Sequence, residues 1–162
     1  VRTIFNSLGP LVNPSQPKYQ LTGTYSLELA KVYQHLLREN GTNYRVVYGT
    51  EGFDELTLTD DTRVFGGKSE QTLNAATFGL TKLAQSSIYG GRTVRDAAKI
   101  VSRILERRGT EEHNFVIAAN TALALQLYHP NEPIIELFKE TLKFIKEGKA
   151  NRSSFFSKTM YL

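Results

Sequence analysis

The residue types best suited to chemistry are concentrated in one short segment. Residues 49–55 read Gly-Thr-Glu-Gly-Phe-Asp-Glu, so two glycines that permit a tight turn precede two adjacent carboxylates, Asp54 and Glu55. The segment follows a predicted strand, which places it at the carboxyl end of a sheet, where open α/β folds bind their ligands. Mg²⁺ prefers oxygen ligands and usually takes one or two carboxylates together with waters and substrate phosphates. Asp54 and Glu55 are therefore candidate Mg²⁺ ligands.

The same two acids have a plainer interpretation. In a regular strand, adjacent side chains point to opposite faces, so Asp54 and Glu55 reach one cation only if the loop breaks that alternation. Without such a break, they are surface acids beside a turn. The pattern of residues 49–55 alone leaves both interpretations open.

Other chemistry-bearing residues show weaker patterns. His35, His113 and His129 have no metal-ligand spacing with one another or with nearby carboxylates. The Gly90-Gly91 pair precedes a predicted helix and could present backbone N–H groups to an anion, although a simple turn is the favoured interpretation. The sequence contains no nucleophile elbow and no Walker phosphate loop. We therefore predict no catalytic nucleophile.

Length and composition are typical of one globular domain. The chain has 162 residues, of which 40% are hydrophobic and 22% charged. It contains no apolar run near the roughly 20 residues that span a bilayer and no signal-peptide pattern, so we expect no membrane partner. It also has no cysteine, which excludes disulfides and thiolate chemistry and fits a reducing cytoplasm.

The net charge of +4 is modest, and the basic residues are scattered. Scattered basic residues are typical of a solvated surface and do not indicate a nucleic-acid interface. A mildly positive protein also suits an anionic small molecule as its partner.

The first third of the chain predicts a βαβ unit. Residues 19–25 alternate as a strand does, and residues 44–48 form a second strand pattern. Between them, apolar residues at helical spacing follow Ser26, a good N-cap, and stop at Asn40-Gly41. A right-handed crossover and parallel pairing follow from this order. Residues 10–17, which contain three prolines, predict an ordered loop before the unit.

A hairpin and three helices complete the predicted architecture. We expect short strands at residues 56–58, 63–65 and 71–73, with a turn at Gly66-Gly67. A capping box of Thr93 and Asp96 starts a helix with an apolar stripe, which we expect Gly109 to close. Residues 115–127 are apolar nearly all round and predict a buried helix, and a third helix begins at Pro133. The fold class is α/β, with a partial parallel sheet, flanking helices and a C-terminal helical stretch.

Several motifs in this order resemble one enzyme family. Residues 2–14 read Arg-Thr-Ile-Phe-Asn-Ser-Leu-Gly-Pro-Leu-Val-Asn-Pro, similar to a specific segment of the anthranilate phosphoribosyltransferases. Residues 18–21 and 47–49 follow at the family's spacing, and residues 52–55, Gly-Phe-Asp-Glu, resemble its metal motif. Residues 118–125 resemble its buried C-terminal helix. The match covers essentially the whole chain and implies a phosphoribosyltransferase and nucleoside-phosphorylase-like fold.

The resemblance implies a reaction. Enzymes of this family join anthranilate to phosphoribosyl pyrophosphate in tryptophan biosynthesis and release pyrophosphate. The amine attacks the anomeric carbon, so the enzyme needs no nucleophile of its own, and Mg²⁺ neutralises charge on the departing pyrophosphate. Asp54 and Glu55 match the pair that holds Mg²⁺ in the family. The resemblance also implies a homodimer in the full-length enzyme.

Parts of the family's pattern have no counterpart here. The sequence lacks the Gly-Thr-Gly-Gly-Asp phosphate loop, the Lys-His-Gly-Asn stretch and the small N-terminal helical domain that makes the dimer contact. The family's anthranilate-binding arginine lies shortly before the segment that Arg2 matches, so Arg2 does not take that role. We expect residues 1–162, which start at Val1 instead of Met, to be the C-terminal portion of the large catalytic domain. By itself this portion should be inactive and should self-associate through an unpaired strand edge.

Three other functions remain as alternatives. A protein of the same fold could bind nucleic acid without catalysing this reaction, and salt-dependent binding would indicate it. A nucleoside phosphorylase would need a phosphate site, for which the acidic pair is unsuited. The isolated chain could also be a purely structural subdomain.

Overall fold

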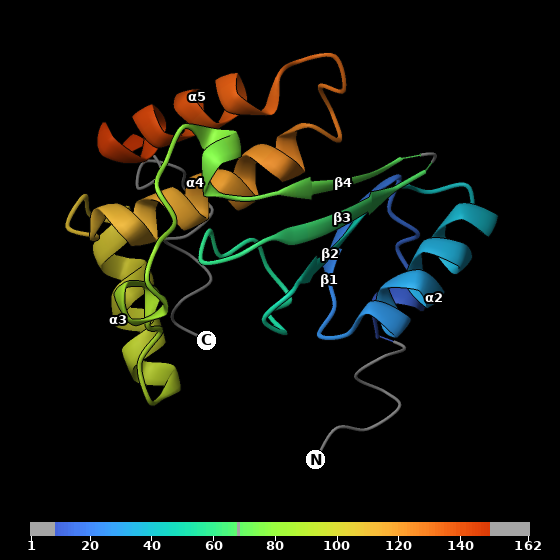
Figure 1. Ribbon diagram of the computed structural model, residues 1–162, viewed down its shortest axis with the longest axis horizontal. Coiled ribbons are helices and arrows are strands. Elements are labelled where there is room, and N and C mark those ends of the chain that lie inside the picture. The colour runs from blue at the N-terminus through green and yellow to red at the C-terminus, as the bar shows by residue number, and fades with distance from the viewer. Residues whose placement is uncertain (1–8, 68, 150–162) are drawn as a thin grey trace.

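The computed structural model describes residues 9–67 and 69–149, which form a mixed α/β fold (Figure 1). Within these residues lie a four-stranded sheet, in the order β1-β2-β3-β4, and four α-helices. Figure 1 shows α2 on one face of the sheet and α4 and α5 on the other. The motif segment before Gly9, Arg2 included, lies outside the described residues.

The predicted βαβ unit is confirmed. It consists of β1 (Tyr19–Gly23), α2 (Leu27–Glu39) and β2 (Asn43–Gly49). The two strands pair in parallel, with Tyr19 opposite Asn43 and Gly23 opposite Val47. The Ser26 hydroxyl caps α2 by accepting a hydrogen bond from the backbone N–H of Leu29 at 3.3 Å.

The predicted hairpin is also confirmed, and it makes the sheet mixed. β3 (Thr62–Gly66) pairs antiparallel with β2 and with β4 (Glu70–Leu73). Parallel pairing within the described residues is therefore confined to β1 and β2. Short 3-10 helices at Gly9–Leu11, Ala75–Phe78 and Gln85–Ile88 lie in the connecting segments.

The strand predicted at residues 56–58 is wrong. These residues lie within the described chain and have no strand assignment, and Leu58 has a positive φ of 64°. Leu56 and Leu58 are nonetheless fully buried in the main hydrophobic core. The apolar pattern correctly indicated burial, but the backbone finds its hydrogen-bond partners outside a β-ladder.

The two final helices are confirmed. α4 (Glu111–Leu125) is the buried helix, with Ala118, Ala119, Ala122 and Leu123 fully buried. α5 (Ile134–Lys146) begins directly after Pro133 and turns Leu137, Phe138 and Ile145 inward. Both helices pack on the face of the sheet that carries Val47 and Val64. The opposite face, with Tyr44, Val46 and Phe65, packs against α2.

α3 (Val94–Leu105) differs from the prediction in two respects. Its capping box forms as expected, but the helix ends at Leu105, and the left-handed residue beyond it is Arg107, not Gly109. Of its apolar stripe, only Ile104 is buried, whereas Val101 remains 43% exposed. A stripe predicts which face of a helix is apolar, but a partner surface decides whether that face is covered.

Within the described residues, no helix is both long enough and apolar enough to cross a membrane.

Candidate functional site

The candidate site is a tight turn at the carboxyl end of β2. The backbone N–H of Gly49 donates to the oxygen of Phe53 at 2.9 Å, and that of Gly52 donates to the oxygen of Gly49 at 2.8 Å. Gly52 has a φ of 87°, a conformation that favours glycine. Asp54 and Glu55 follow this turn in irregular backbone, and both are exposed. The alternation of a regular strand therefore does not separate their side chains.

The carboxyl end of β1 lies directly against the acidic pair. A Cβ atom added to Gly23, the last residue of β1, would overlap the backbone oxygen of Asp54. Only glycine allows the two segments to approach so closely. Next to this contact, the backbone N–H of Thr24 donates to the oxygen of Val47 at 2.8 Å, which keeps β1 and β2 in register at the site. The acids thus lie where two parallel strands end.

The buried helix α4 holds the segment from the other side. The Asn120 side chain accepts a hydrogen bond from the Leu56 N–H at 3.1 Å and donates one to the Leu56 oxygen at 2.8 Å. In the sequence, Asn120 belongs to the segment of residues 118–125 that resembles the family's buried helix. A polar amide within an otherwise apolar helix was the signal that could have drawn attention to it, because buried polar groups require partners.

Hydrogen bonds of three threonine hydroxyls stabilise the turn. The Thr59 hydroxyl donates to the Glu51 carboxylate at 2.6 Å and lies 2.8 Å from the Thr57 hydroxyl. Thr50 donates both its N–H and its hydroxyl to the backbone oxygen of Asp61, at 3.0 and 2.9 Å. The carboxylate of Glu51, the third acid of the segment, therefore already has a hydrogen-bond partner within the fold. Among the described residues, no side chain forms such a hydrogen bond with the carboxylate of Asp54 or Glu55.

The electrostatics of the pair suit a cation. Although Glu55 as a whole is exposed, partial loss of water around its carboxylate raises its pKa, and the negative charge of Asp54 raises it further. Two carboxylates that repel one another are the donor set that a divalent cation would relieve. The described residues contain no group of three or more His, Cys, Asp and Glu placed to hold a metal ion. Two carboxylates match the number that Mg²⁺ usually takes from a protein when a substrate's phosphates complete its shell.

The three histidines lie on other parts of the fold. His35 on α2 contacts Arg38, His113 at the start of α4 contacts the hydroxyl of Thr110, and His129 contacts Glu132. None of these contacts involves the acidic pair.

The start of α3 does not support the anion-site interpretation of Gly90-Gly91. Gly91 has a φ of 92° and packs against Asp96. The backbone N–H of Thr93 donates to the Asp96 carboxylate at 3.1 Å, and that of Asp96 donates to the Thr93 hydroxyl at 3.1 Å. These N–H groups are thus engaged by the capping box and are not free for an anion.

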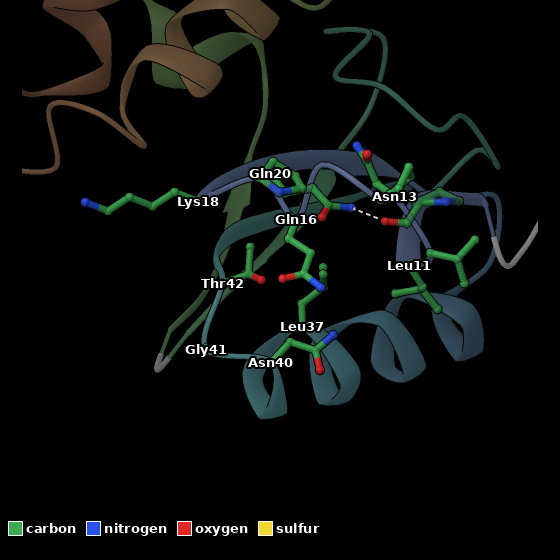
Figure 2. A pocket seen from close by; sticks show the side chains of 13 residues that line it. Leu11, Asn13, Gln16, Lys18, Gln20, Leu37, Asn40, Gly41 and Thr42 are labelled. Atoms are coloured by element: carbon green, nitrogen blue, oxygen red, sulfur yellow. Dashed lines mark hydrogen bonds between the residues drawn. The ribbon is translucent and has the colours of Figure 1, made fainter.

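A separate cavity of about 490 Å³ lies at the opposite end of the sheet (Figure 2). Its walls come from residues 10–14 and 16–18, from Gln20 of β1, and from the end of α2 and the segment that leads into β2. Figure 2 shows Gln16, Asn40 and Thr42 around the cavity, whereas Lys18 extends away from it. The cavity adjoins the amino ends of β1 and β2, so it is not part of the site at their carboxyl ends.

Fold and site together point to a transferase family. The model of the glycosyl transferase family, a/b domain, matches residues 1–151, and the chain belongs to this family. Within it, the chain resembles anthranilate phosphoribosyltransferases. It is 42% identical over 144 residues to that of Flavobacterium psychrophilum, covering 88% of this chain and 44% of the relative. It is 37% identical to that of Bacteroides fragilis, covering 94% and 46% of the two chains.

Solved structures of anthranilate phosphoribosyltransferases share the fold. Anthranilate phosphoribosyltransferase from Saccharomyces cerevisiae, in complex with PRPP and Mg, aligns with a TM-score of 0.80 and 26% identity. That alignment covers 94% of this chain and 44% of the yeast chain. The Thermus thermophilus enzyme aligns with a TM-score of 0.78 and 28% identity, covering 93% and 45%. The chain therefore spans less than half the length of the relatives it matches.

Proposed function

We propose that this chain is the metal-holding portion of an enzyme that transfers phosphoribosyl from phosphoribosyl pyrophosphate to anthranilate. The observation that carries this proposal is the position of Asp54 and Glu55 on a braced turn where β1 and β2 end. Family membership and the names of the relatives support it, as does the yeast structure with PRPP and Mg.

Asp54 and Glu55 would hold Mg²⁺ in this reaction. When bound, Mg²⁺ neutralises the negative charge that develops on the departing pyrophosphate. The amine of anthranilate attacks the anomeric carbon directly, so the protein's task is to position the two substrates. The turn that ends at Phe53 keeps the acids at the sheet edge, and the exposure of both side chains leaves them open to the phosphates of a substrate.

The isolated 162-residue chain is inactive in this proposal. It spans 44–46% of the relatives' length, so the substrate pockets need residues that lie elsewhere in such an enzyme. The complete enzyme is a homodimer in the cytoplasm, in keeping with a biosynthetic reaction between water-soluble metabolites.

The first experiment compares this chain with the intact natural gene product, whose mass is determined beforehand. Both are assayed with anthranilate, phosphoribosyl pyrophosphate and Mg²⁺. In the intact product, the double variant Asp54→Asn and Glu55→Gln should lower kcat/KM at least about a hundredfold, because a bound metal contributes several kcal/mol to the transition state. Asn and Gln keep the size of the side chains and remove only their charge.

Glu39→Gln is the matched control, since it removes an exposed acid at the C-terminal end of α2. It should leave kcat/KM within about twofold of the unmodified protein. Turnover by the isolated chain would contradict the proposal that it is inactive. Wild-type activity in the double variant would contradict the proposal that Asp54 and Glu55 hold Mg²⁺.

A further inference from the structure

The buried helix α4 reaches the candidate site through a single amide. Asn120 uses its carbonyl oxygen and one N–H to bond both backbone groups of Leu56, a residue 64 positions earlier in the chain. Its Nδ2 also donates to the backbone oxygen of Val116 at 2.9 Å, one turn earlier on α4. An Asn amide has two donors and one acceptor group. Since these three bonds use both kinds of group, they hold the amide plane in one orientation.

Leu56 needs this partner because no strand supplies one. Its side chain is fully buried, and residues 56–58 form no strand in the described structure. A buried backbone N–H and C=O without partners are costly, so most are paired. Asn120 takes the place of a neighbouring strand at this one residue.

The acidic pair therefore lies between two fixed points. On one side, the oxygen of Phe53 accepts from the Gly49 N–H, and on the other side Asn120 holds Leu56. Only Asp54 and Glu55 separate these two anchors. Loss of the second anchor would free the backbone at Glu55 while leaving the turn at Gly49 intact.

We propose that Asn120 is a positioning residue that sets the orientation of Asp54 and Glu55 by holding the backbone of Leu56. This inference rests on the proposed function, in which the two acids hold Mg²⁺. Groups that orient metal ligands without touching the metal commonly change metal affinity by 10–100-fold when they are removed. A purely structural amide would lower stability but would leave the Mg²⁺ dependence unchanged.

The first test is amide hydrogen exchange in the intact protein that contains this chain. Asn120→Ala should raise the exchange rate of the Leu56 amide at least about tenfold relative to other core amides. Asn114→Ala is the matched control. Asn114 is on the same helix, is 8% exposed, and its side-chain oxygen has no partner among the described residues. An unchanged exchange rate of Leu56 in Asn120→Ala, or an equal rise in both variants, would overturn the clamp, by which we mean the two hydrogen bonds that join Asn120 to the backbone of Leu56.

The second test is the Mg²⁺ dependence of turnover. Asn120→Ala should raise the Mg²⁺ concentration for half-maximal activity by about 10–100-fold, whereas the KM for anthranilate and the Asn114→Ala variant should stay within about twofold of wild type. Asn120→Asp serves if the alanine variant fails to fold. The aspartate side chain has the size of asparagine and can still accept the hydrogen bond from the Leu56 N–H. When ionised, it has no N–H to donate to the oxygen of Leu56. This variant should therefore also raise the Mg²⁺ concentration for half-maximal activity.

The two proposals fail in different ways. If the unmodified protein shows no turnover, the proposed function fails, and the positioning role fails with it, although hydrogen exchange still decides whether the clamp exists. If turnover depends on Asp54 and Glu55 but both Asn120 variants keep the wild-type Mg²⁺ dependence, the positioning role alone is overturned.

Discussion

At the scale of single residues, the site depends on the absence of a side chain at Gly23. Gly23 ends β1 where the backbone of Asp54 passes, and there is no room for a Cβ between them. Gly23 therefore determines how closely the acidic pair can approach the ends of β1 and β2. Its function is steric, because its φ is not positive.

Gly23→Ala should displace residues 54 and 55 and destabilise the fold. Overpacking of a tight contact typically costs about 1–3 kcal/mol, and here the obstacle is backbone, which cannot swing aside as a flexible side chain can. The free energy of unfolding, measured by urea denaturation of the folded protein, gives the cost. In the intact gene product, the same variant should also raise the Mg²⁺ requirement.

Gly90→Ala is the control for Gly23→Ala. Nothing lies within 4 Å of a Cβ at Gly90, and its φ is not positive, so the substitution should change the free energy of unfolding by no more than about 0.5 kcal/mol. If both substitutions cost the same, the close approach of β1 to Asp54 is not a determinant of stability.

At the scale of elements, the stability of helix α3 depends more on its N-terminal cap than that of helix α4 does. The Thr93 hydroxyl accepts from the Asp96 N–H at 3.1 Å, and the Asp96 carboxylate accepts from the Thr93 N–H at 3.1 Å. Only Ile104 of this helix is buried. α4, by contrast, has five buried residues. Since packing contributes most of the stability of protein helices, a poorly covered helix relies more on its terminal hydrogen bonds.

Thr93→Ala should therefore destabilise α3 locally. Loss of an N-cap hydroxyl costs about 1 kcal/mol, and amide exchange in α3 should rise several-fold while α4 is unaffected. Val94→Ala is the control, because Val94 is 88% exposed and does not cap the helix. Equal amide exchange rates in the two variants would mean that the capping box contributes nothing to the stability of α3.

The capping box also predicts a dependence on pH. The hydrogen bond from the Thr93 side chain lowers the pKa of Asp96 below its usual value. A lowered carboxyl pKa contributes stability above the unfolded pKa, near 4, and that contribution disappears as the pH falls through the folded value. The difference in stability between wild type and Thr93→Ala, measured by denaturation across this range, should be largest near neutral pH and should shrink in acid. A difference that does not change with pH would contradict the role of the Asp96 carboxylate.

At the scale of the whole molecule, apolar and backbone surfaces remain uncovered. Within the described residues, β1 pairs only with β2 and so forms an edge of the sheet. An apolar groove of about 180 Å³ lies between α3, α4 and α5, and Val101 and Phe144, at 43% and 47% exposed, contribute to it. Unpaired strand edges and exposed apolar patches promote association.

The isolated chain should therefore self-associate. Sedimentation velocity over a range of concentrations should show a mass that rises with concentration. Thr22→Lys, which places a charge on the β1 edge, should reduce the association. Thr72→Lys places the same charge on β4, the other edge strand, and should have a smaller effect. A monomer at all concentrations would show that the unpaired edge of β1 does not cause association. A larger effect of Thr72→Lys would show that the chains associate through β4.

The sequence by itself determined the features that depend on neighbouring residues. The βαβ unit, the hairpin and the caps at Ser26 and Thr93 are all confirmed, because period, turn chemistry and capping act over a few positions. The place of Asp54 and Glu55 after a turn at a strand end also followed from local pattern. The family resemblance, supported by the comparisons, came from the same short motifs.

Only the tertiary structure decided which surfaces and backbone groups meet. It brought Gly23 against Asp54 and joined Asn120 to Leu56 across 64 positions, and neither contact leaves a periodic signal. It also replaced the expected strand at residues 56–58 with a side-chain clamp and left the stripe of α3 largely uncovered. The physical reason is the same in each case. Burial and backbone pairing depend on the partner that the fold supplies, and that partner comes from a distant part of the chain.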